Sequence, residues 1–221
     1  MDLANIKLPI ANGERMKARD LTIKPCSLNA CRTFIETHHY SHSVNGVKVT
    51  QCFDVRHDGR QVGAILFGTM STTAWKKFGA SEAEVLELRR LVLLDEAERN
   101  SESRVIGASI KWIRQNIPNV RRIVSYADPN HGHSGTIYRA SNFTYWGLSA
   151  PDIGLLDSET GRVYHSRALR TKYKGDLKPF ARRLREKQER GVVVPHRLEG
   201  KHCYVYDLPA RQHHRTFGQE Q

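Results

Sequence analysis

The chain has no apolar run approaching the roughly 18 residues that indicate a membrane-spanning helix. The segment from Met1 to Lys17 also has no continuous apolar stretch. This second absence excludes a secretory signal peptide, because the central region of such a peptide is apolar. We therefore expect a soluble, cytoplasmic protein that has no membrane partner.

Cysteine is scarce, and none of the four cysteines forms a Cys-x-x-Cys pair. A disulfide framework is rare in a cytosolic domain of this size, so we expect none. Cys26 and Cys31 could join histidines around zinc, but their spacing is loose for such a site. Free cysteines are usually buried and unreactive. We predict this state for Cys26, Cys31, Cys52 and Cys203.

Acidic residues are in deficit, because 35 Lys and Arg outnumber 23 Asp and Glu and give a net charge of +12. The excess concentrates between residues 162 and 201, where thirteen Lys and Arg face only four Asp and Glu. A strongly positive field favours nucleic acid or an anionic membrane as partner. Without any membrane signal, nucleic acid is the better expectation.

Residues 178–191 lie inside this basic region and read as a helix, with a proline near the first turn and a glycine past the last. Its apolar stripe is thin. The segment is either a solvated surface helix or a nucleic-acid-binding face, and the local charge excess favours the second. Arg182, Arg183 and Arg185 are the candidate DNA contacts.

The remaining patterns alternate strands with helices and so predict a mixed α/β (α+β) fold. Asp58-Gly59 between two β-prone runs is typical of a hairpin turn. Residues 86–94 read equally well as a buried strand or as part of a helix. The expected elements are strands at 21–24, 50–57, 61–68, 121–126 and 143–148, and helices that begin near residues 27–29, 100–101 and 134.

The segment 123–146 carries the densest set of chemistry-bearing residues. A strand delivers Asp128 to a turn that contains His131 and His133, and Tyr138 follows on a short helix. Ligands in open α/β sheets bind at the carboxyl ends of strands, which makes this a candidate site. The alternatives are local, because aspartate is common in Asx turns and Tyr138 could be a core aromatic.

Three further clusters could contact a ligand. His38-His39-Tyr40-Ser41-His42 supplies metal ligands or acid–base groups, or else a helix-end histidine stabilised by the dipole. Trp75-Lys76-Lys77-Phe78 either stacks a base while holding phosphates with Lys76 and Lys77, or anchors the core with its lysines outside. Arg89 and Arg90 lie in a strand-like stretch, where at least one of them could hold a phosphate or a structural carboxylate.

The segment 123–146, the run Glu87-Leu-Arg-Arg-Leu-Val-Leu and the 38–42 cluster resemble the Mom family of phage DNA-modification proteins over roughly residues 21–150. The resemblance implies a GNAT-like central sheet flanked by helices, and hence a strand at 86–94. It also implies addition of a methylcarbamoyl (carbamoylmethyl) group to N6 of a flipped adenine in double-stranded DNA, which protects that DNA from restriction.

The resemblance further implies which residues act. It places functional roles on His39, Tyr40, Asp128 and Tyr138, and it associates the family with iron, for which these four residues are the candidate ligands. The sequence does not identify the donor of the transferred group.

An acyl-CoA donor is disfavoured by the segment 98–107. GNAT enzymes hold the coenzyme A pyrophosphate on a glycine-containing loop before a helix, with free backbone N–H groups. Here no glycine precedes the helix, and Glu98 and Glu102 would repel the pyrophosphate. Two alternatives stay open: a conventional acyl-CoA-dependent GNAT N-acetyltransferase, and a non-catalytic DNA-binding protein or a nuclease that uses the clustered histidines.

The expected domain organisation has three parts. Residues 1–20 form an N-terminal extension, residues 21–150 form the GNAT-like catalytic core, and residues 151–221 form a basic C-terminal region with a helix and strands that contacts nucleic acid.

Overall fold

The computed structural model describes residues 15–209, so most of the expected N-terminal extension lies outside the described residues. The chain forms two compact units. Among the described residues, the core unit contains residues 15–126, 135–146 and 203–209, and the inserted unit contains residues 127–134 and 147–202. No helix within residues 15–209 is long and apolar enough to cross a membrane.

A seven-stranded sheet in the order β1-β2-β3-β4-β5-β12-β6 forms the centre of the fold. The pairs β1–β2, β2–β3 and β3–β4 are antiparallel, and β4–β5 is parallel. This mixed sheet, flanked by helices, is the GNAT-like architecture that the resemblance implied. Its strands are β1 (Thr22–Cys26), β2 (Val49–His57), β3 (Arg60–Thr69), β4 (Val85–Leu93), β5 (Arg122–Ala127), β6 (Thr144–Leu148) and β12 (His202–Asp207).

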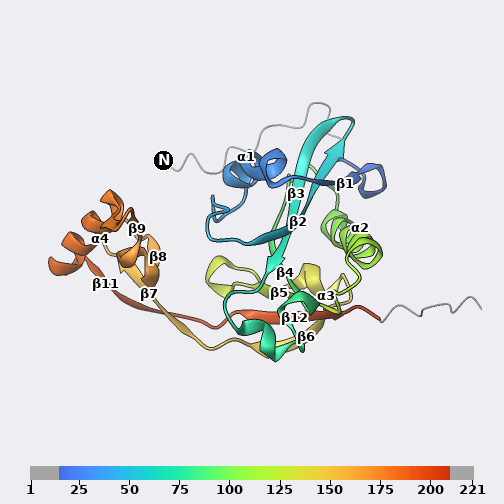
Figure 1. The fold of residues 1–221 in the computed structure, drawn as a ribbon. Coiled ribbons are helices and arrows are strands. Elements are labelled where there is room, and N and C mark those ends of the chain that lie inside the picture. The colour runs from blue at the N-terminus through green and yellow to red at the C-terminus, as the bar shows by residue number, and fades with distance from the viewer. Residues whose placement is uncertain (1–14, 210–221) are drawn as a thin grey trace, which may run out of the picture. The chain divides into compact units, whose positions relative to one another are not determined.

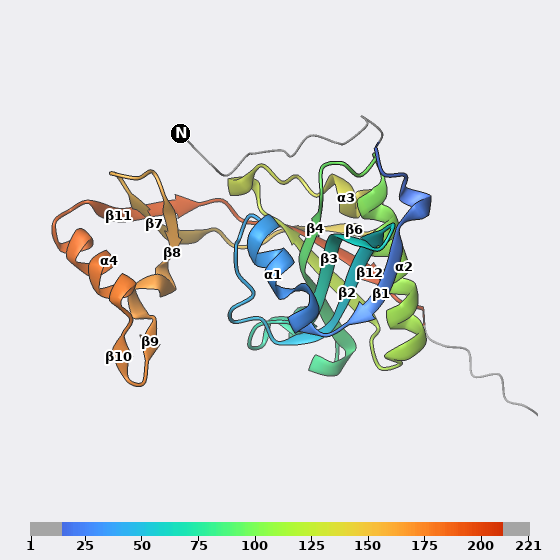
Figure 2. The ribbon, with the colours of Figure 1, turned by 90° about the horizontal axis from the view of Figure 1, so that it is seen from above.

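Helices α1 (Leu28–His38) and α2 (Ser101–Asn116) lie on opposite faces of this sheet (Figures 1 and 2). The α1 face buries Cys31 and Ile35 against Cys52 and Leu66 of the sheet. On the other face, Phe53 meets the indole of Trp112 edge-to-face with ring centroids 5.4 Å apart. Neighbouring strand residues point to opposite faces, so β2 and β3 are apolar on both sides.

The local sequence patterns predicted these elements correctly. Ser27 caps α1 by accepting from the N–H of Ala30, and Asp58 and Gly59 form the β2–β3 turn with φ of 47° and 79°. Residues 85–93 are a strand, as the resemblance implied. A 3-10 turn, Glu82–Glu84, lies directly before this strand. The following residues are extended because they pair with β3 and β5 in the sheet.

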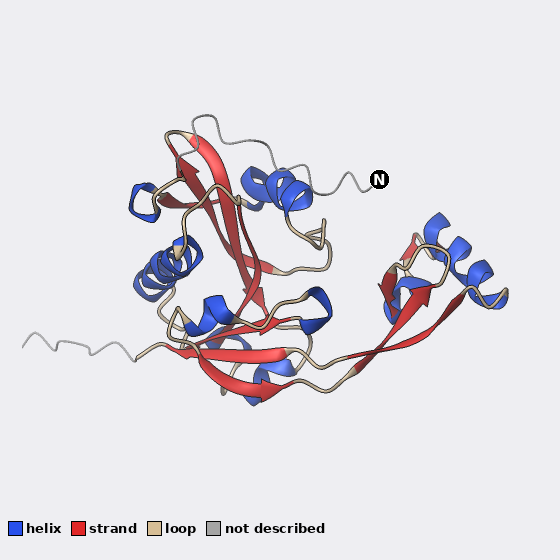
Figure 3. Ribbon diagram, turned by 180° about the vertical axis from the view of Figure 1, so that it is seen from behind, coloured by secondary structure: helices blue, strands red, loops and turns tan. Residues whose placement is uncertain are grey.

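The inserted unit is built on a three-stranded sheet in the order β11-β7-β8. The predicted basic helix is confirmed as α4, and its Leu184 packs with Leu155 and Val193 in a small core. Figure 3 shows this unit's helices and strands. Its elements are β7 (Asp152–Asp157), β8 (Val163–His165), the 3-10 helix η6 (Ser166–Arg170), β9 (Lys172–Tyr173), β10 (Asp176–Leu177), α4 (Pro179–Glu189) and β11 (Val193–Leu198).

The chain therefore differs from the expected boundary at residue 150. After the inserted unit it returns to the central sheet, where β12 pairs between β5 and β6. The basic segment is thus an insertion between two strands of one sheet. Local patterns did not reveal this, because strand order is set by pairing partners that are distant in sequence.

Gly135 is a position where the fold requires glycine. It has a φ of +77°, and a Cβ there would overlap the ring of Tyr204. We predict that Gly135→Ala lowers the free energy of unfolding by about 2–4 kcal/mol, through left-handed strain and overpacking. Gly107→Ala is the matched control, since Gly107 lies in α2 with nothing within 4 Å of an added Cβ. It should stabilise by about 0.5–1 kcal/mol. Urea denaturation measures both, and equal effects would contradict the prediction.

Candidate active site

The His39-Tyr40 pair lies in the turn that ends α1. The N–H of His39 donates to the carbonyl of Ile35 at 2.9 Å and closes the helix. Its ring is 6 % exposed, whereas Tyr40 is 48 % exposed, and the two ring centroids are 4.3 Å apart. The turn thus buries an imidazole beneath a tyrosine that faces outward.

Hydrogen bonds fix the imidazole of His39. The N–H of Ser41 donates to Nδ1 of His39 at 3.1 Å, and the Ser41 hydroxyl lies 2.9 Å from the same nitrogen. An Nδ1 that accepts leaves the proton of a neutral ring on Nε2. The Ser41 hydroxyl also donates to the carbonyl of Ser43 at 3.2 Å, which extends the network along the loop.

Arg90 attaches this loop to β4. Its Nε donates to the carbonyl of Ser43 at 3.1 Å, and its Nη1 donates to the carbonyl of Arg89 at 2.7 Å. Burial is the main cause that lowers the pKa of Arg90, while Tyr40 and Glu87 raise it and the neighbouring Arg89 lowers it. Arg90 is therefore a positioning residue for the His39-Tyr40 turn.

Glu87 and Arg89 form an ion pair on β4, with 2.6 Å between a carboxylate oxygen and Nη1, and both side chains are mostly buried. Arg89 and Arg90 thus have partners within the protein, and their predicted DNA contact stays a prediction. Local patterns did not single out Glu87. The available signal was a carboxylate inside an otherwise apolar strand, where a charge needs a partner.

Tyr138 lies on the short helix α3 (Thr136–Arg139) and is 8 % exposed. Its ring packs 5.7 Å from Phe143 and 5.4 Å from Tyr204, so the expected core-aromatic packing is present. Burial, with contributions from Tyr40 and Glu87, raises the pKa of Tyr138. Its hydroxyl therefore stays protonated at neutral pH, and Tyr40 and Glu87 share its electrostatic surroundings.

Asp128 belongs to the inserted unit and caps the 3-10 turn Pro129–His131. Its Oδ1 accepts from the backbone and side-chain N–H groups of Asn130 at 3.1 and 2.9 Å, and its Oδ2 lies 2.7 Å from Nζ of Lys201. Burial alone would raise the pKa of Asp128, but the bonds from Lys201 and Asn130 outweigh it and lower the pKa. The carboxylate is an anion at neutral pH.

Two contacts of this carboxylate have different origins. The Asx turn with Asn130 is the local structure that the sequence allowed. Lys201 is distant in sequence, and no local pattern pointed to it. Asn130 also forms two hydrogen bonds with the backbone of Glu199. Its Nδ2 donates to the carbonyl and its Oδ1 accepts from the N–H, each at 3.2 Å. These bonds hold the 128–131 turn beside the segment that carries Lys201.

Trp75 is a core anchor with lysines outside it. It packs beside the buried cluster that contains Phe78 and Val85, and the ammonium of Lys76 lies 5.8 Å from the centroid of its ring. Lys76 and Lys77 are exposed at the end of the 3-10 helix Ala74–Lys77. The half-buried Trp75 shows the packing expected of an anchor, and the predicted contact of Lys76 and Lys77 with nucleic acid stays a prediction.

The arginines of α4 do not share one face. Arg182 and Arg185 are three positions apart and so lie on the same side of the helix, whereas Arg183 is turned away from them. All three are exposed. A ligand along one side of α4 would meet Arg182 and Arg185 without Arg183.

The four cysteines are free, and Cys31, Cys52 and Cys203 are buried while Cys26 is half-buried. Burial is the main cause that raises the pKa of Cys203 to about 11. This largely confirms the expected inert, buried thiols. No group of three or more His, Cys, Asp or Glu residues within residues 15–209 is arranged to hold a metal ion.

Comparison with known proteins gives one family and one fold. The model of the Mom protein family matches residues 20–220. The methylcarbamoylase mom of Escherichia phage Mu is 31 % identical over 180 residues, which cover 80 % of this chain and 72 % of that protein.

Solved structures with the same fold are acetyltransferases. The IAA acetyltransferase from Bacillus cereus aligns with a TM-score of 0.50 at 7 % identity, over 85 % of this chain and 99 % of that one. A Bacillus subtilis acetyltransferase in complex with CoA aligns at 0.44 and 9 % identity, over 86 % and 99 %. Identities this low concern the fold alone.

The contact between Lys201 and Asp128 predicts a pH effect. A carboxyl whose pKa is lowered on folding stabilises the protein above its unfolded pKa of about 3.9. This stabilisation is lost as pH falls through the lower, folded pKa. We predict that Lys201→Met raises the pKa of Asp128, because burial then acts against fewer hydrogen bonds, and so reduces the stability gained above pH 4.

Carboxyl carbon NMR titration, together with unfolding measured between about pH 2 and pH 7, tests this pH effect. Lys172→Met is the matched control, because Lys172 has no carboxylate partner among residues 15–209. If the pKa of Asp128 is the same in both variants as in the unchanged protein, the ion pair has no role in holding the carboxylate ionised.

Proposed function

Because the chain belongs to the Mom protein family, we propose that it adds a methylcarbamoyl group to N6 of adenine in double-stranded DNA and so protects that DNA from restriction. The observation that carries the proposal is the 31 % identity to the phage Mu methylcarbamoylase, which extends over 80 % of this chain. The ionisation states of Asp128 and Tyr138 support it.

Adenine N6 is a weak nucleophile, because its lone pair is delocalised into the ring, and it is inaccessible inside a stacked duplex. The base must therefore leave the stack, as it does for other enzymes that modify bases. In the proposed reaction N6 forms a bond to the transferred group, the bond between that group and the leaving group of the donor breaks, and the N6 proton passes to the departing group or to water.

Asp128 has the properties of a hydrogen-bond acceptor for the N6 amino group. The bonds from Lys201 and Asn130 keep it ionised and lower its pKa. This low basicity suits an acceptor that orients and polarises N6–H better than a strong proton-removing base. Tyr138, whose raised pKa keeps its hydroxyl protonated, is a hydrogen-bond donor.

The His39-Tyr40 turn supplies the remaining groups. Tyr40 is half exposed and offers a ring for stacking and a hydroxyl for hydrogen bonding. His39 accepts a hydrogen bond at Nδ1 and carries its proton on Nε2, so a neutral ring offers Nε2–H as a hydrogen-bond donor. Arg90 holds this turn on β4 through Ser43.

Iron binding by His39, Tyr40, Asp128 and Tyr138 stays a prediction, and the geometry around Asp128 fits it poorly. Oδ2 of Asp128 already contacts the ammonium of Lys201 at 2.7 Å, so a second cation there would have to displace the lysine. The proposed roles need only the protein's own side chains. Metal analysis of the purified protein and of His39→Ala tests whether this histidine is a ligand.

A conventional acyl-CoA acetyltransferase is the second candidate, because solved acetyltransferases share the fold. The loop between β4 and α2 argues against it. The N–H groups of Ala97, Glu98 and Ser101 donate to the carbonyls of Leu94, Met16 and Glu98, respectively. The side chain of Glu98 is also engaged, because its Oε1 accepts from the N–H of Ala18 at 2.6 Å. These three backbone donors of the loop are thus engaged within the chain and are not free for a pyrophosphate.

We predict that acetyl-CoA binds this protein weakly or not at all. Three N–H groups of the loop are engaged and Glu98 adds a carboxylate there, and both features oppose a pyrophosphate although Arg99 and Arg104 line the same hollow. Isothermal titration calorimetry measures the affinity, and the Bacillus subtilis acetyltransferase whose structure contains CoA is the positive control. Saturable low-micromolar binding would contradict the prediction and favour the conventional acetyltransferase.

The proposed activity has a direct test. DNA from cells that express the protein should contain an adenosine that is heavier by an amide-bearing substituent at N6, detected by mass spectrometry of digested nucleosides. Asp128→Asn, Tyr138→Phe and Tyr40→Phe should each reduce it, by about 10²–10⁴-fold if the residue handles a proton. These changes conserve shape and remove one charge or one hydroxyl.

Tyr164→Phe is the matched control for this test, because Tyr164 packs in the core of the inserted unit beside Arg162. It should leave the modification unchanged. Unmodified but bound DNA would support a non-catalytic DNA-binding protein, and cut DNA would support a nuclease. Normal modification by Asp128→Asn would remove Asp128 from the mechanism.

A further inference from the structure

Basic residues of the inserted unit are concentrated in η6, the β9–β10 hairpin and the first half of α4, which follow one another along the chain. Residues 166–185 contain eight Lys and Arg and one acidic residue, Asp176. All eight cations are exposed. We call this surface the hairpin face, and its cations are Arg167, Arg170, Lys172, Lys174, Lys178, Arg182 and Arg185, whereas Arg183 lies on another side of α4.

The cations of this unit fall into two groups. At the end of α4, Lys187 contacts Asp157 and Glu159 at 2.8 Å each, and Arg190 lies 3.9 Å from Glu159. These cations help to hold the unit together. Within residues 15–209, no carboxylate pairs with Arg167, Arg170, Lys172, Lys174, Lys178 or Arg182. Mutual repulsion among them is a cost that a bound polyanion would remove.

The hairpin presents an aromatic ring among these cations. Its two-residue loop, Lys174-Gly175, has φ of 51° and 91°, the geometry of a tight hairpin turn. Tyr173 beside the loop is 64 % exposed, and the ammonium of Lys174 lies 5.6 Å from its ring centroid. An exposed ring beside lysines is typical of surfaces that stack a base or sugar while holding phosphates.

The base of the hairpin is held in place. The N–H of Lys178 donates to the carbonyl of Thr171 at 2.9 Å, and Nε of Arg185 donates to the carbonyl of Leu169 at 2.9 Å. The second bond ties α4 to η6. The hairpin is therefore presented by two anchored helices, which lowers the ordering cost of binding.

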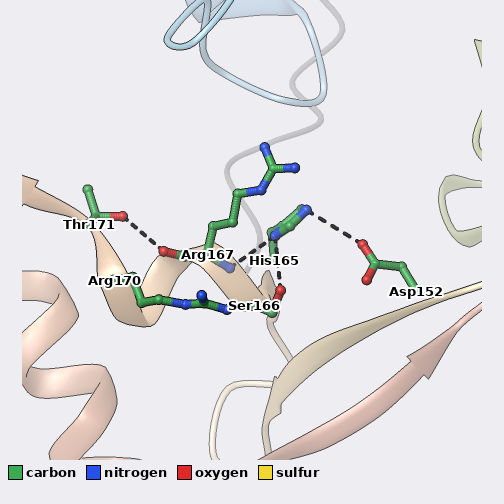
Figure 4. Close-up of a pocket in the computed structure, with 6 residues that line it drawn as sticks. All are labelled: Asp152, His165, Ser166, Arg167, Arg170 and Thr171. Carbon is green, nitrogen blue, oxygen red and sulfur yellow. Dashed lines mark hydrogen bonds and ion pairs between the residues drawn. The ribbon is translucent and has the colours of Figure 1, made fainter. Parts of the chain in front are cut away.

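Two hollows flank the hairpin. One, of about 590 Å³, is lined by Tyr173, Lys174, Lys178 and Arg182, together with Asp176. The other, of about 620 Å³, is lined by Arg167, Arg170 and the hydroxyl residues Ser166 and Thr171 (Figure 4). Its carboxylate, Asp152, lies 3.5 Å from Nε2 of His165 and accepts from the N–H of Ile153, so it is already engaged.

We propose that the hairpin face binds the phosphodiester backbone of duplex DNA, with phosphates in the two hollows and a sugar or base edge against Tyr173. Guanidinium, ammonium and hydroxyl groups are the usual backbone contacts, and they position a duplex without reading its sequence. The choice of DNA rests on the proposed function. The surface itself rests on charge, exposure and the missing carboxylate partners.

Fluorescence anisotropy of the full chain with a labelled duplex, measured over a range of salt concentrations, tests this proposal. Each neutralised phosphate contributes about 0.9 to the slope of log affinity against log salt. Lys174→Ala with Lys178→Ala should therefore reduce that slope by about 2. The matched control is Lys24→Ala with Lys48→Ala, two exposed lysines of the core unit, and it should leave the slope unchanged.

The tyrosine has its own pair of variants. Tyr173→Ala should weaken binding about tenfold without altering the salt slope, because the contact of an uncharged ring with a sugar or base edge releases no counterions. Tyr173→Phe keeps the ring and should bind as the unchanged protein does. Thermal unfolding of all variants checks that the exposed substitutions leave the fold intact.

The outcomes separate this proposal from the proposed chemistry. An unchanged slope for the Lys174 and Lys178 variant, or an equal loss in the Lys24 and Lys48 control, overturns the hairpin face even if adenosine is modified. A smaller salt slope for the Lys174 and Lys178 variant alone supports the hairpin face even if no modified adenosine is found. Tighter binding of an RNA duplex through the same residues would overturn DNA as the occupant.

Discussion

Charged side chains on a strand that the sheet buries constrain the core unit more than any other feature. β4 carries Glu87, Arg89 and Arg90 between apolar neighbours, and removing such charges from water costs several kcal/mol per ion unless they are paired. Glu87 and Arg89 pair with each other. Arg90 instead reaches the carbonyl of Ser43, and that bond fixes the turn on which His39 and Tyr40 lie. The burial of one strand thus places the candidate active-site turn.

The inserted unit distributes its charges by the same rule. Where a carboxylate is buried, as at Asp157 and Asp128, the fold supplies a lysine within 2.8 Å. Asp128 thereby becomes a fixed anion, which is what an acceptor for an amino group requires. The other cations, on the hairpin face, have no such partner and face outward, where a polyanion can neutralise them. One basic segment therefore serves both internal stability and an external surface.

The fold and the donor chemistry are separate questions in this protein. The fold of the sheet and its helices is that of acetyltransferases, but three N–H groups of the loop before α2 donate to the carbonyls of Leu94, Met16 and Glu98 of the same chain. A pyrophosphate site depends on donors left unengaged by the fold, and such donors are a local property of one loop. The shared architecture therefore concerns the fold alone and does not imply coenzyme A.

Local sequence determined the elements whose signals are short in range. The Asp58-Gly59 turn, the Ser27 cap, α2 and α4 all follow from turn, cap and periodicity rules that involve neighbouring residues. Net charge and its concentration in residues 162–201 are likewise properties of the sequence alone. The segment 85–93 was ambiguous because a short apolar run fits a strand or a helix, and only its pairing with β3 and β5 decided the matter.

Tertiary structure decided the features that depend on distant partners. It brought Lys201 to Asp128 and Ser43 to Arg90, and it returned β12 to the central sheet. It also separated Arg183 from Arg182 and Arg185, because the helical repeat places neighbouring residues on different sides of the helix. Which carboxylate is ionised, and which cation remains for a ligand, follows from contacts in space. Those contacts join residues far apart in sequence, beyond the range of any local pattern.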